Sequence, residues 1–441
     1  MQLEPFLTAY DPTDLPAGSV DPLGFDRGYT WLADKILPGL TNVASQPRYL
    51  SVLCASIHLA DEFRGGGSVR ERERVRRETV LSVERYWALG CLLVAREAGR
   101  DTTSVRGINY VKAAAAKLDD TGAKGTRADY RLLSRQATYG MLGIYTSVAE
   151  NLRLLRDDAF ALSADLGPRL AQAFIAETGL SENGLGRAMA LGEEVSLKRL
   201  LAWAERAQVS ALPESKESTV LQEAVVARDV RRRMVALLAK HSARDGEAEM
   251  DRLGRVLGVL ATTDQDADLR EALRTIVAFE QSFREVVTVL MRLVWKCQSA
   301  PPFAVALGEI EQDPVISAVL PPLARAVREL DTALEEGRTP AFRDGIGRIA
   351  DARAFLREAA AATRPAELAI AVTKRHRDVQ RAKLTRGQPK MPWIELRDDQ
   401  IVPTLAAAQR VDRPPTGPGD VAPHPYRIFA ADQLARHGGL A

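Results

Sequence analysis

The chain has 441 residues, more than a single hydrophobic core usually organises, so we expect two or three domains. Its hydrophobic content of 46% and charged content of 27% are those of an ordinary soluble globular protein. The net charge of +2 excludes a global field that would draw the protein to nucleic acid or to a membrane. Any such binding must therefore come from a local patch.

The cysteines and the apolar runs predict the compartment. Cys54, Cys91 and Cys297 lie far apart, each within an apolar helical run, which favours buried free thiols in a reducing environment over a disulfide framework. We find no signal-like N-terminal segment and no apolar run approaching the ~18 residues of a membrane span. We therefore expect a cytoplasmic protein that makes no membrane contact.

The N-terminal third predicts an arm followed by a helical domain at residues 21–180. Residues 1–20 are rich in proline and predict an extended arm. Asp26 is the expected cap of a helix that runs to about residue 36, where Pro38-Gly39 would end it. Ser45 is the expected N-cap of the next helix, which runs to about residue 63.

Further helices and one short strand complete this domain. Gly65-Gly66-Gly67 interrupts the chain, and Ser68 with Glu71 forms the capping-box pattern of a long helix. The apolar spacing then predicts a strand at 159–162, preceded and followed by helices. The expected helices are 68–98, 108–118, 134–154 and 164–177.

Residues 181–388 predict a helical bundle, because the expected helices are joined by short connections. Their starts carry capping or rigid residues, namely Ser215, Asp264, Asp313 before Pro314, Thr339 before Pro340, and Arg364 before Pro365. The expected helices are 194–208, 216–241, 245–261, 265–298, 314–336, 341–361 and 365–385.

The C-terminal part departs from this helical pattern. Apolar residues alternate around the acidic pair Asp398-Asp399, which predicts a β-hairpin within residues 389–410. Residues 411–441 predict a Pro/Gly-rich linker and tail. The expected fold is thus mainly α, with multi-helix domains, a small winged-helix-like element at about 127–177 and a C-terminal β-hairpin.

Established catalytic signatures are absent from the sequence. The order of Gly122-Ala123-Lys124-Gly125-Thr126 is wrong for a phosphate-binding loop, and the histidines show no HExxH or paired spacing. No serine or cysteine lies in a nucleophile-elbow context. We therefore expect neither a metal nor a cofactor, and no catalytic residue can be assigned.

Polar residues of unexplained role crowd the junction between the first two helices. They are Asn42, Arg48, Tyr49, His58 and Glu62. His58, Asp61 and Glu62 could share one helix face as metal ligands, but a simple His–carboxylate pair at a helix end is the more ordinary interpretation. A structural hinge between two core helices explains most of the junction, and a hidden site remains the alternative.

A first candidate for nucleic-acid contact lies at the winged-helix-like element. Arg127, Arg131, Arg135 and Gln136 lead into a helix and the expected strand, as they would in the second half of a winged helix, where basic and amide side chains reach phosphates and base edges. The alternatives are a winged helix that docks a protein, and plain core.

A second candidate is a basic helix near the end of the bundle. Lys374, Arg377 and Arg381 recur at helical spacing with Gln380 and Lys383 beside them, a pattern that can follow a phosphate backbone. The alternative is an ordinary solvated face. Trp393 could stack on a base or anchor the hairpin.

One stretch resembles a known group of proteins. The run Leu37-Pro38-Gly39-Leu40-Thr41-Asn42 followed by Arg48-Tyr49 is similar to a signature of uncharacterised bacterial helical proteins encoded beside restriction or anti-phage genes. Arg106-Gly107-Ile108-Asn109-Tyr110 and Gln136-Ala137-Thr138-Tyr139-Gly140 loosely fit the same family. The resemblance implies a component of a multi-gene antiviral defence or DNA-handling system, with no assigned reaction or site.

The sequence thus favours a non-enzymatic subunit of a bacterial anti-phage defence or DNA-handling complex. It would bind other subunits of that complex by protein–protein interaction, nucleic acid (DNA or RNA), or both. One alternative is a metal-dependent nuclease or other toxic effector enzyme with a site near His58, joined by Arg48. Another is a purely structural helical scaffold.

Overall fold

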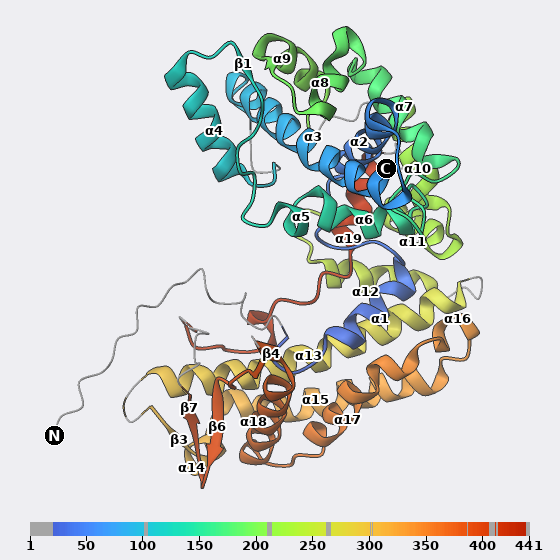
Figure 1. Ribbon diagram of the computed structural model, residues 1–441. Helices are drawn as coiled ribbons and strands as arrows, with labels where there is room; N and C mark the ends of the chain where they lie inside the picture. Colours follow the sequence, from blue (N-terminus) through green and yellow to red (C-terminus); the bar gives the residue numbers. More distant parts are fainter. Residues whose placement is uncertain are drawn as a thin grey trace, which may run out of the picture. The chain divides into compact units, whose positions relative to one another are not determined.

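The computed structural model describes residues 21–100, 105–209, 214–261, 266–299, 301, 303–385, 387–404, 411 and 413–437. The expected arm at 1–20 and the expected cap Asp264 lie outside these residues, as do parts of the hairpin segment, linker and tail. The protein is mainly helical with a few short antiparallel strands, which confirms the expected fold class (Figure 1). No helix in the described ranges is long and apolar enough to cross a membrane.

The chain divides into two compact units, each assembled from two separate stretches. Unit 1 comprises Met1–Lys35 and Glu247–Tyr426, and unit 2 comprises Ile36–Gly246 and Arg427–Ala441. This division differs from the boundary expected at about residue 180, because helices from both sides of that point pack on each other. The early helices of unit 2 contact its later ones throughout.

The core of unit 2 is built on two helices, α2 (Arg48–Arg64) and α3 (Val69–Glu97), which pack against each other. Ser68 caps α3 by accepting a hydrogen bond from the backbone N–H of Glu71 (3.2 Å), as expected. Around this pair lie α4 (Ile108–Thr121), α6 (Met141–Asn151), α7 (Leu166–Thr178), α8 (Leu185–Leu191) and α9 (Leu197–Arg206).

Smaller elements and the C-terminal helix complete unit 2. Strand β1 (Gly125–Thr126) pairs antiparallel with β2 (Val195–Ser196), and η1 (Glu182–Gly184) precedes α8. Helix α10 (Lys216–Val226), capped by Ser215, is followed by α11 (Asp229–Lys240). The last helix, α19 (Ile428–His437), packs on α10 and α11, so the red C-terminal helix lies among green ones (Figure 1).

Unit 1 is organised around the long helix α13 (Ala267–Ser299), which lies against α15 (Pro314–Glu336). Asp313 and Thr339 cap α15 and α16 as expected. The early helix α1 (Asp26–Ile36) joins this unit through Phe25, whose ring meets Phe279 and Phe283 edge-on. The other helical segments are α12 (Glu249–Leu260), α14 (Leu307–Glu311), α16 (Pro340–Arg343), η2 (Ile346–Ile349), α17 (Ala350–Ala360), α18 (Pro365–Ala382) and η3 (Pro418–Asp420).

The expected C-terminal hairpin is present and gains a third strand. β6 (Ile394–Arg397) and β7 (Gln400–Pro403) pair antiparallel around Asp398-Asp399, and β3 (Val305–Ala306) adds to β7. A second small pair joins β4 (Leu384–Thr385) and β5 (Gln388–Pro389). Trp393 is only 7% exposed and packs on His376, so it anchors the hairpin and is not available to stack on a base.

Three local expectations are corrected by the structure. Residues 159–162 form no strand but a loop with one isolated bridge, Leu155 to Leu162, so no two-stranded wing forms within residues 127–177. Ser45 is not the cap of α2, because Pro47 occupies the N-cap position. The expected helix at 134–154 divides at Gly140 into α5 (Gln136–Tyr139) and α6.

Candidate functional site

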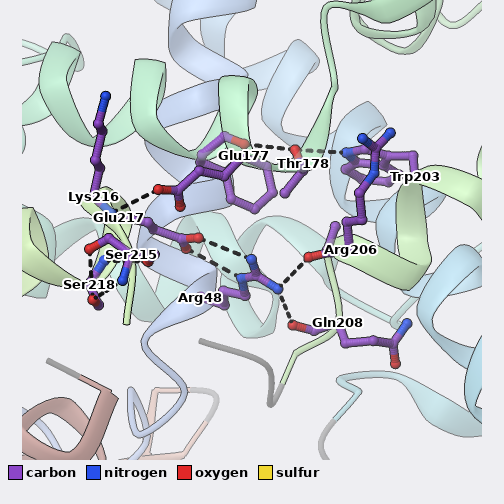
Figure 2. A network of polar contacts seen from close by, with 12 residues as sticks. Arg48, Glu177, Thr178, Trp203, Arg206, Gln208, Ser215, Lys216, Glu217 and Ser218 are labelled. Atoms are coloured by element: carbon purple, nitrogen blue, oxygen red, sulfur yellow. Dashed lines mark hydrogen bonds and ion pairs between the residues drawn. The ribbon is translucent and has the colours of Figure 1, made fainter. Parts of the chain in front are cut away.

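Arg48 lies in a buried ion pair inside unit 2 (Figure 2). Its guanidinium donates to both carboxylate oxygens of Glu217, at 3.3 and 3.0 Å, and to the carbonyl oxygens of Arg206 and Gln208, at 2.8 and 2.9 Å. Burial raises the pKa of Glu217, and the charge of Arg48 opposes that rise. Arg48 therefore joins the start of α2 to α10 and to the end of α9.

The rest of the junction is also built into the core of unit 2. The Tyr49 ring stacks on Tyr145 at 4.8 Å between centroids, and its hydroxyl accepts from the backbone N–H of Arg106 (2.9 Å). Asn42 accepts from the backbone N–H of Arg427 (2.8 Å), immediately before α19. Arg231 is fully buried and donates to the carbonyl of Pro38 (2.9 Å), and burial lowers its pKa to about 10. These contacts favour the structural interpretation of the junction.

The structure does not bring His58 and Arg48 together. They are ten residues apart on α2, which places them roughly 15 Å apart along the helix axis. His58 Nε2 lies 3.9 Å from Glu62, while Asp61 is held by both Nε and Nη2 of Arg76, at 2.7 and 3.1 Å. Within the described ranges, no group of three or more His, Cys, Asp or Glu side chains could hold a metal ion.

The basic helix near the end of the bundle is only partly available to a ligand. Lys374 is exposed, but Arg377 pairs with Asp378 (2.8 Å) and Arg381 with Glu395 (2.9 Å). Gln380 is buried, and Lys383 donates to the backbone carbonyl of Asp21. Two of the five expected contacts therefore point into the protein, and two of the remaining cations are already paired with a carboxylate.

The candidate at the winged-helix-like element has a different outcome. Gln136 is used internally: its amide accepts from Arg85 (3.0 Å) and donates to Leu81 (3.0 Å) and Glu84 (2.8 Å). Arg127, Arg131 and Arg135 are exposed. Three lysines of the same part of the chain, which belong to no recognisable sequence motif, are exposed as well: Lys112, Lys117 and Lys124.

We call Lys117, Lys124, Arg127, Arg131 and Arg135, with Tyr110 and Tyr139, the α4–α5 surface; Lys112 is two residues from Tyr110 and lies on another side of α4. Tyr110 is 41% and Tyr139 51% exposed, which is high for tyrosine, and the Arg131 guanidinium lies 5.7 Å from the centre of the Tyr110 ring. Among the described residues, none of the five cations forms an ion pair. Of the three acids in residues 105–140, Asp119 is already paired with Arg96 (2.6 Å), so positive charge predominates.

The structure also reveals a buried cluster that sequence reasoning missed. Glu280 of α13 accepts from the hydroxyl of Tyr426 (2.7 Å), and Nδ1 of His424 lies 2.6 Å from the same carboxylate oxygen. The Tyr29 ring stacks on that imidazole, with 4.5 Å between centroids. The sequence offers only one sign of this cluster, a lone glutamate on an apolar helix face. The partners of Glu280 lie more than 140 residues away, so no local spacing connects them. The cluster orients the imidazole and joins residues 424–426 to α13.

Comparisons of the chain with protein-family models, with curated proteins and with solved structures find no match.

Proposed function

We propose that the protein binds single-stranded nucleic acid through the α4–α5 surface. The observation that carries this proposal is the combination of unpaired exposed cations with two exposed tyrosines. Single strands are bound where cations follow the phosphates and aromatic rings stack on bases, without a helix that reads a groove. The missing wing removes the structural basis for winged-helix docking into a DNA major groove, which favours single strands over duplex DNA.

The wider role stays a prediction from the sequence as a whole. There the protein is a non-enzymatic subunit of a bacterial anti-phage defence or DNA-handling complex, located in the cytoplasm. The contacts of Arg48 and Asp61 with residues other than His58 weaken the alternative of a nuclease site near His58.

A pair of matched charge-reversal variants tests the proposal. One variant carries Arg127→Glu, Arg131→Glu and Arg135→Glu, and the other carries Lys374→Glu, Arg377→Glu and Arg381→Glu, with the same change in net charge. Binding to single-stranded DNA, single-stranded RNA and duplex DNA is measured by fluorescence anisotropy across a salt series. The first variant should make the slope of log K against log salt less steep by about 2. Each phosphate of a single strand that is no longer neutralised reduces the steepness by roughly 0.7, and three arginines are lost.

The second charge variant and two tyrosine variants distinguish binding at the α4–α5 surface from a general effect of net charge. The second variant should leave most of the salt slope intact, and Tyr110→Ala with Tyr139→Ala should weaken binding by about 1–3 kcal/mol for each stacked base. Equal losses in the two charge variants would reduce the effect to net charge. No binding of any nucleic acid by the wild-type protein would refute the proposal.

A further inference from the structure

Unit 1 contains a pocket that the proposed function does not use. It lies between the end of α15, the turn η2 and the start of α17, and has a volume of about 540 Å³. This volume lies within the range of sites that hold small organic molecules. Ile346, Ala350 and Ala354 give it an accessible apolar part, whereas Leu334 and Ile349, which also line it, are almost fully buried.

Two arginines in this pocket are held in fixed positions by acids. Asp331 accepts from Nε of Arg353 (2.6 Å) and from Nε of Arg357 (2.7 Å), one arginine on each carboxylate oxygen. Glu335 accepts from Nη2 of Arg353 (3.0 Å) and, more weakly, from Nη2 of Arg357 (3.5 Å). The Nη1 group of each arginine makes no hydrogen bond to a described residue. The two guanidinium groups are therefore ordered and still have donors to offer.

A third arginine leaves the lining with excess positive charge. Arg343 donates through Nη1 to the carbonyl of Gly337 (3.2 Å) and forms no ion pair within the described part of the chain. Three arginines thus oppose two acids, Asp331 and Glu335. Burial opposes the ionisation of Asp331, but hydrogen bonds from Arg357 and Arg353 outweigh it and lower its pKa, so this carboxyl group is charged at neutral pH. With Asp331, which pairs with two of these arginines from outside the lining, the net charge around the pocket is one positive unit.

We propose that this pocket binds a small organic anion, whose carboxylate or phosphate group lies against Arg343, Arg353 and Arg357 and whose apolar part lies against Ile346, Ala350 and Ala354. Guanidinium groups bind carboxylate and phosphate through paired hydrogen bonds, and arginines already ordered by acids lose little freedom on binding. The apolar part of the pocket favours an organic anion over inorganic phosphate.

Four probes separate the charged group from the apolar body. Phenyl phosphate and phenylacetate carry both parts, inorganic phosphate carries only the charge, and benzyl alcohol carries only the ring. Dissociation constants are measured by ligand-observed NMR on the full-length protein, since ligands of this size bind in the range of about millimolar. At least one of the first two should bind about tenfold more tightly than either partial probe. One charge-assisted hydrogen bond contributes that much over benzyl alcohol, and burial of the ring contributes a similar amount over inorganic phosphate. Whichever of phenyl phosphate and phenylacetate binds more tightly shows whether the pocket prefers a phosphate or a carboxylate group.

Two lining variants and one control locate the binding. Arg343→Glu reverses an exposed charge without breaking an ion pair, and Gly347→Leu fills the pocket at a position where an added Cβ meets no atom within 4 Å. Both should weaken binding about tenfold or more, by repulsion and by exclusion respectively. Arg348→Ala removes a cation from the same turn outside the lining and should leave binding unchanged.

Three results would overturn the proposal: no binding of either organic anion, equal binding of benzyl alcohol, or full binding in both lining variants. If one lining variant fails to fold, the other carries the test. The charge-reversal variant at Arg127, Arg131 and Arg135 should bind the anion as the wild type does. Failure of nucleic-acid binding and failure of this pocket are therefore separate results.

Discussion

At the scale of single residues, the junction shows how unusual residue choices can serve the core. Arg48 is 3% exposed, yet its charge is matched by Glu217 and its remaining donors meet two carbonyl groups. A buried ion pair of this kind contributes little net stability, but removing one partner leaves the other buried and uncompensated. The pair therefore makes folding of unit 2 depend on both residues together.

Removing one partner of this ion pair should lower the free energy of unfolding, and replacing both partners with apolar residues should restore most of it. We expect Arg48→Met to lower the free energy of unfolding by about 3–5 kcal/mol, and Arg48→Met with Glu217→Leu to regain most of that loss. Urea unfolding measures both variants. Arg96→Met, which breaks the exposed pair with Asp119, serves as the control and should cost at most about 1 kcal/mol. A loss in Arg48→Met no larger than in this control would contradict the expectation.

Glu285 predicts a distinct dependence of stability on pH. Its Oε2 is buried without a hydrogen-bond partner among the described residues, and burial raises its pKa to about 7 against the pull of Arg284 and Arg325. Between pH 4.5 and 7 the folded protein keeps this proton and the unfolded chain loses it, so the contribution of Glu285 to stability falls as pH rises through that window.

The variant Glu285→Gln isolates this contribution. The variant should gain stability relative to the wild type as pH rises from about 5 to about 8, by at most about 3 kcal/mol, and the difference should level off above about pH 7. Urea unfolding at a series of pH values measures it, because the other titrating groups cancel in the difference. A difference that is independent of pH would show that Glu285 is ionised in the folded protein.

At the scale of elements, the sequence predicts most helices and misplaces their interruptions. Capping and helix-ending residues such as Ser68, Asp313 and Pro38-Gly39 act locally, so their positions follow from the sequence. The division at Gly140 does not, because it depends on Glu84 of another helix, which accepts from the backbone N–H of Met141 (2.6 Å) and so caps α6. A cap supplied from a distance leaves no local signal.

The same limit applies to the candidate sites. The exposed arginines of the α4–α5 surface were predictable from a run of charges, whereas the internal use of Gln136 was not, since its partners Leu81 and Glu84 lie on α3. The hairpin was predictable from alternation around Asp398-Asp399, but its third strand comes from residues 305–306. The pocket in unit 1 depends on Asp331 reaching two arginines one helical turn apart on α17, which spacing alone does not assign.

At the scale of the whole molecule, both units are discontinuous in sequence. Helix α19 returns to unit 2 after unit 1 has been completed, and it buries Ile428, Ala431 and Leu434 there. Asn42 and the carbonyl of Leu37 hold its start through Arg427. Unit 2 therefore depends on a segment that lies almost 200 residues beyond the rest of its chain.

Removing that segment should destabilise one unit selectively. A chain that ends at Tyr426 should lose about 3–6 kcal/mol from unit 2, on the basis of burying one isoleucine and one leucine side chain. Hydrogen exchange followed by mass spectrometry should then show loss of protection in α10 and α11 and unchanged protection in α13 and α15. The control is Phe429→Ala, whose side chain is 52% exposed. Equal loss of protection in both units would contradict selective dependence.

The interleaving of the two units also sets an order of events during synthesis. Residues 21–35 leave the ribosome before α13, against which Phe25 packs, and about 230 residues separate them. At about 5–20 residues per second, the nascent first helix waits roughly 10–50 s for its partner. Unit 2 is completed after unit 1, because α19 follows every other described helix in the chain. Neither unit can finish folding before residues beyond about 420 have been made, because each needs a late stretch of the chain.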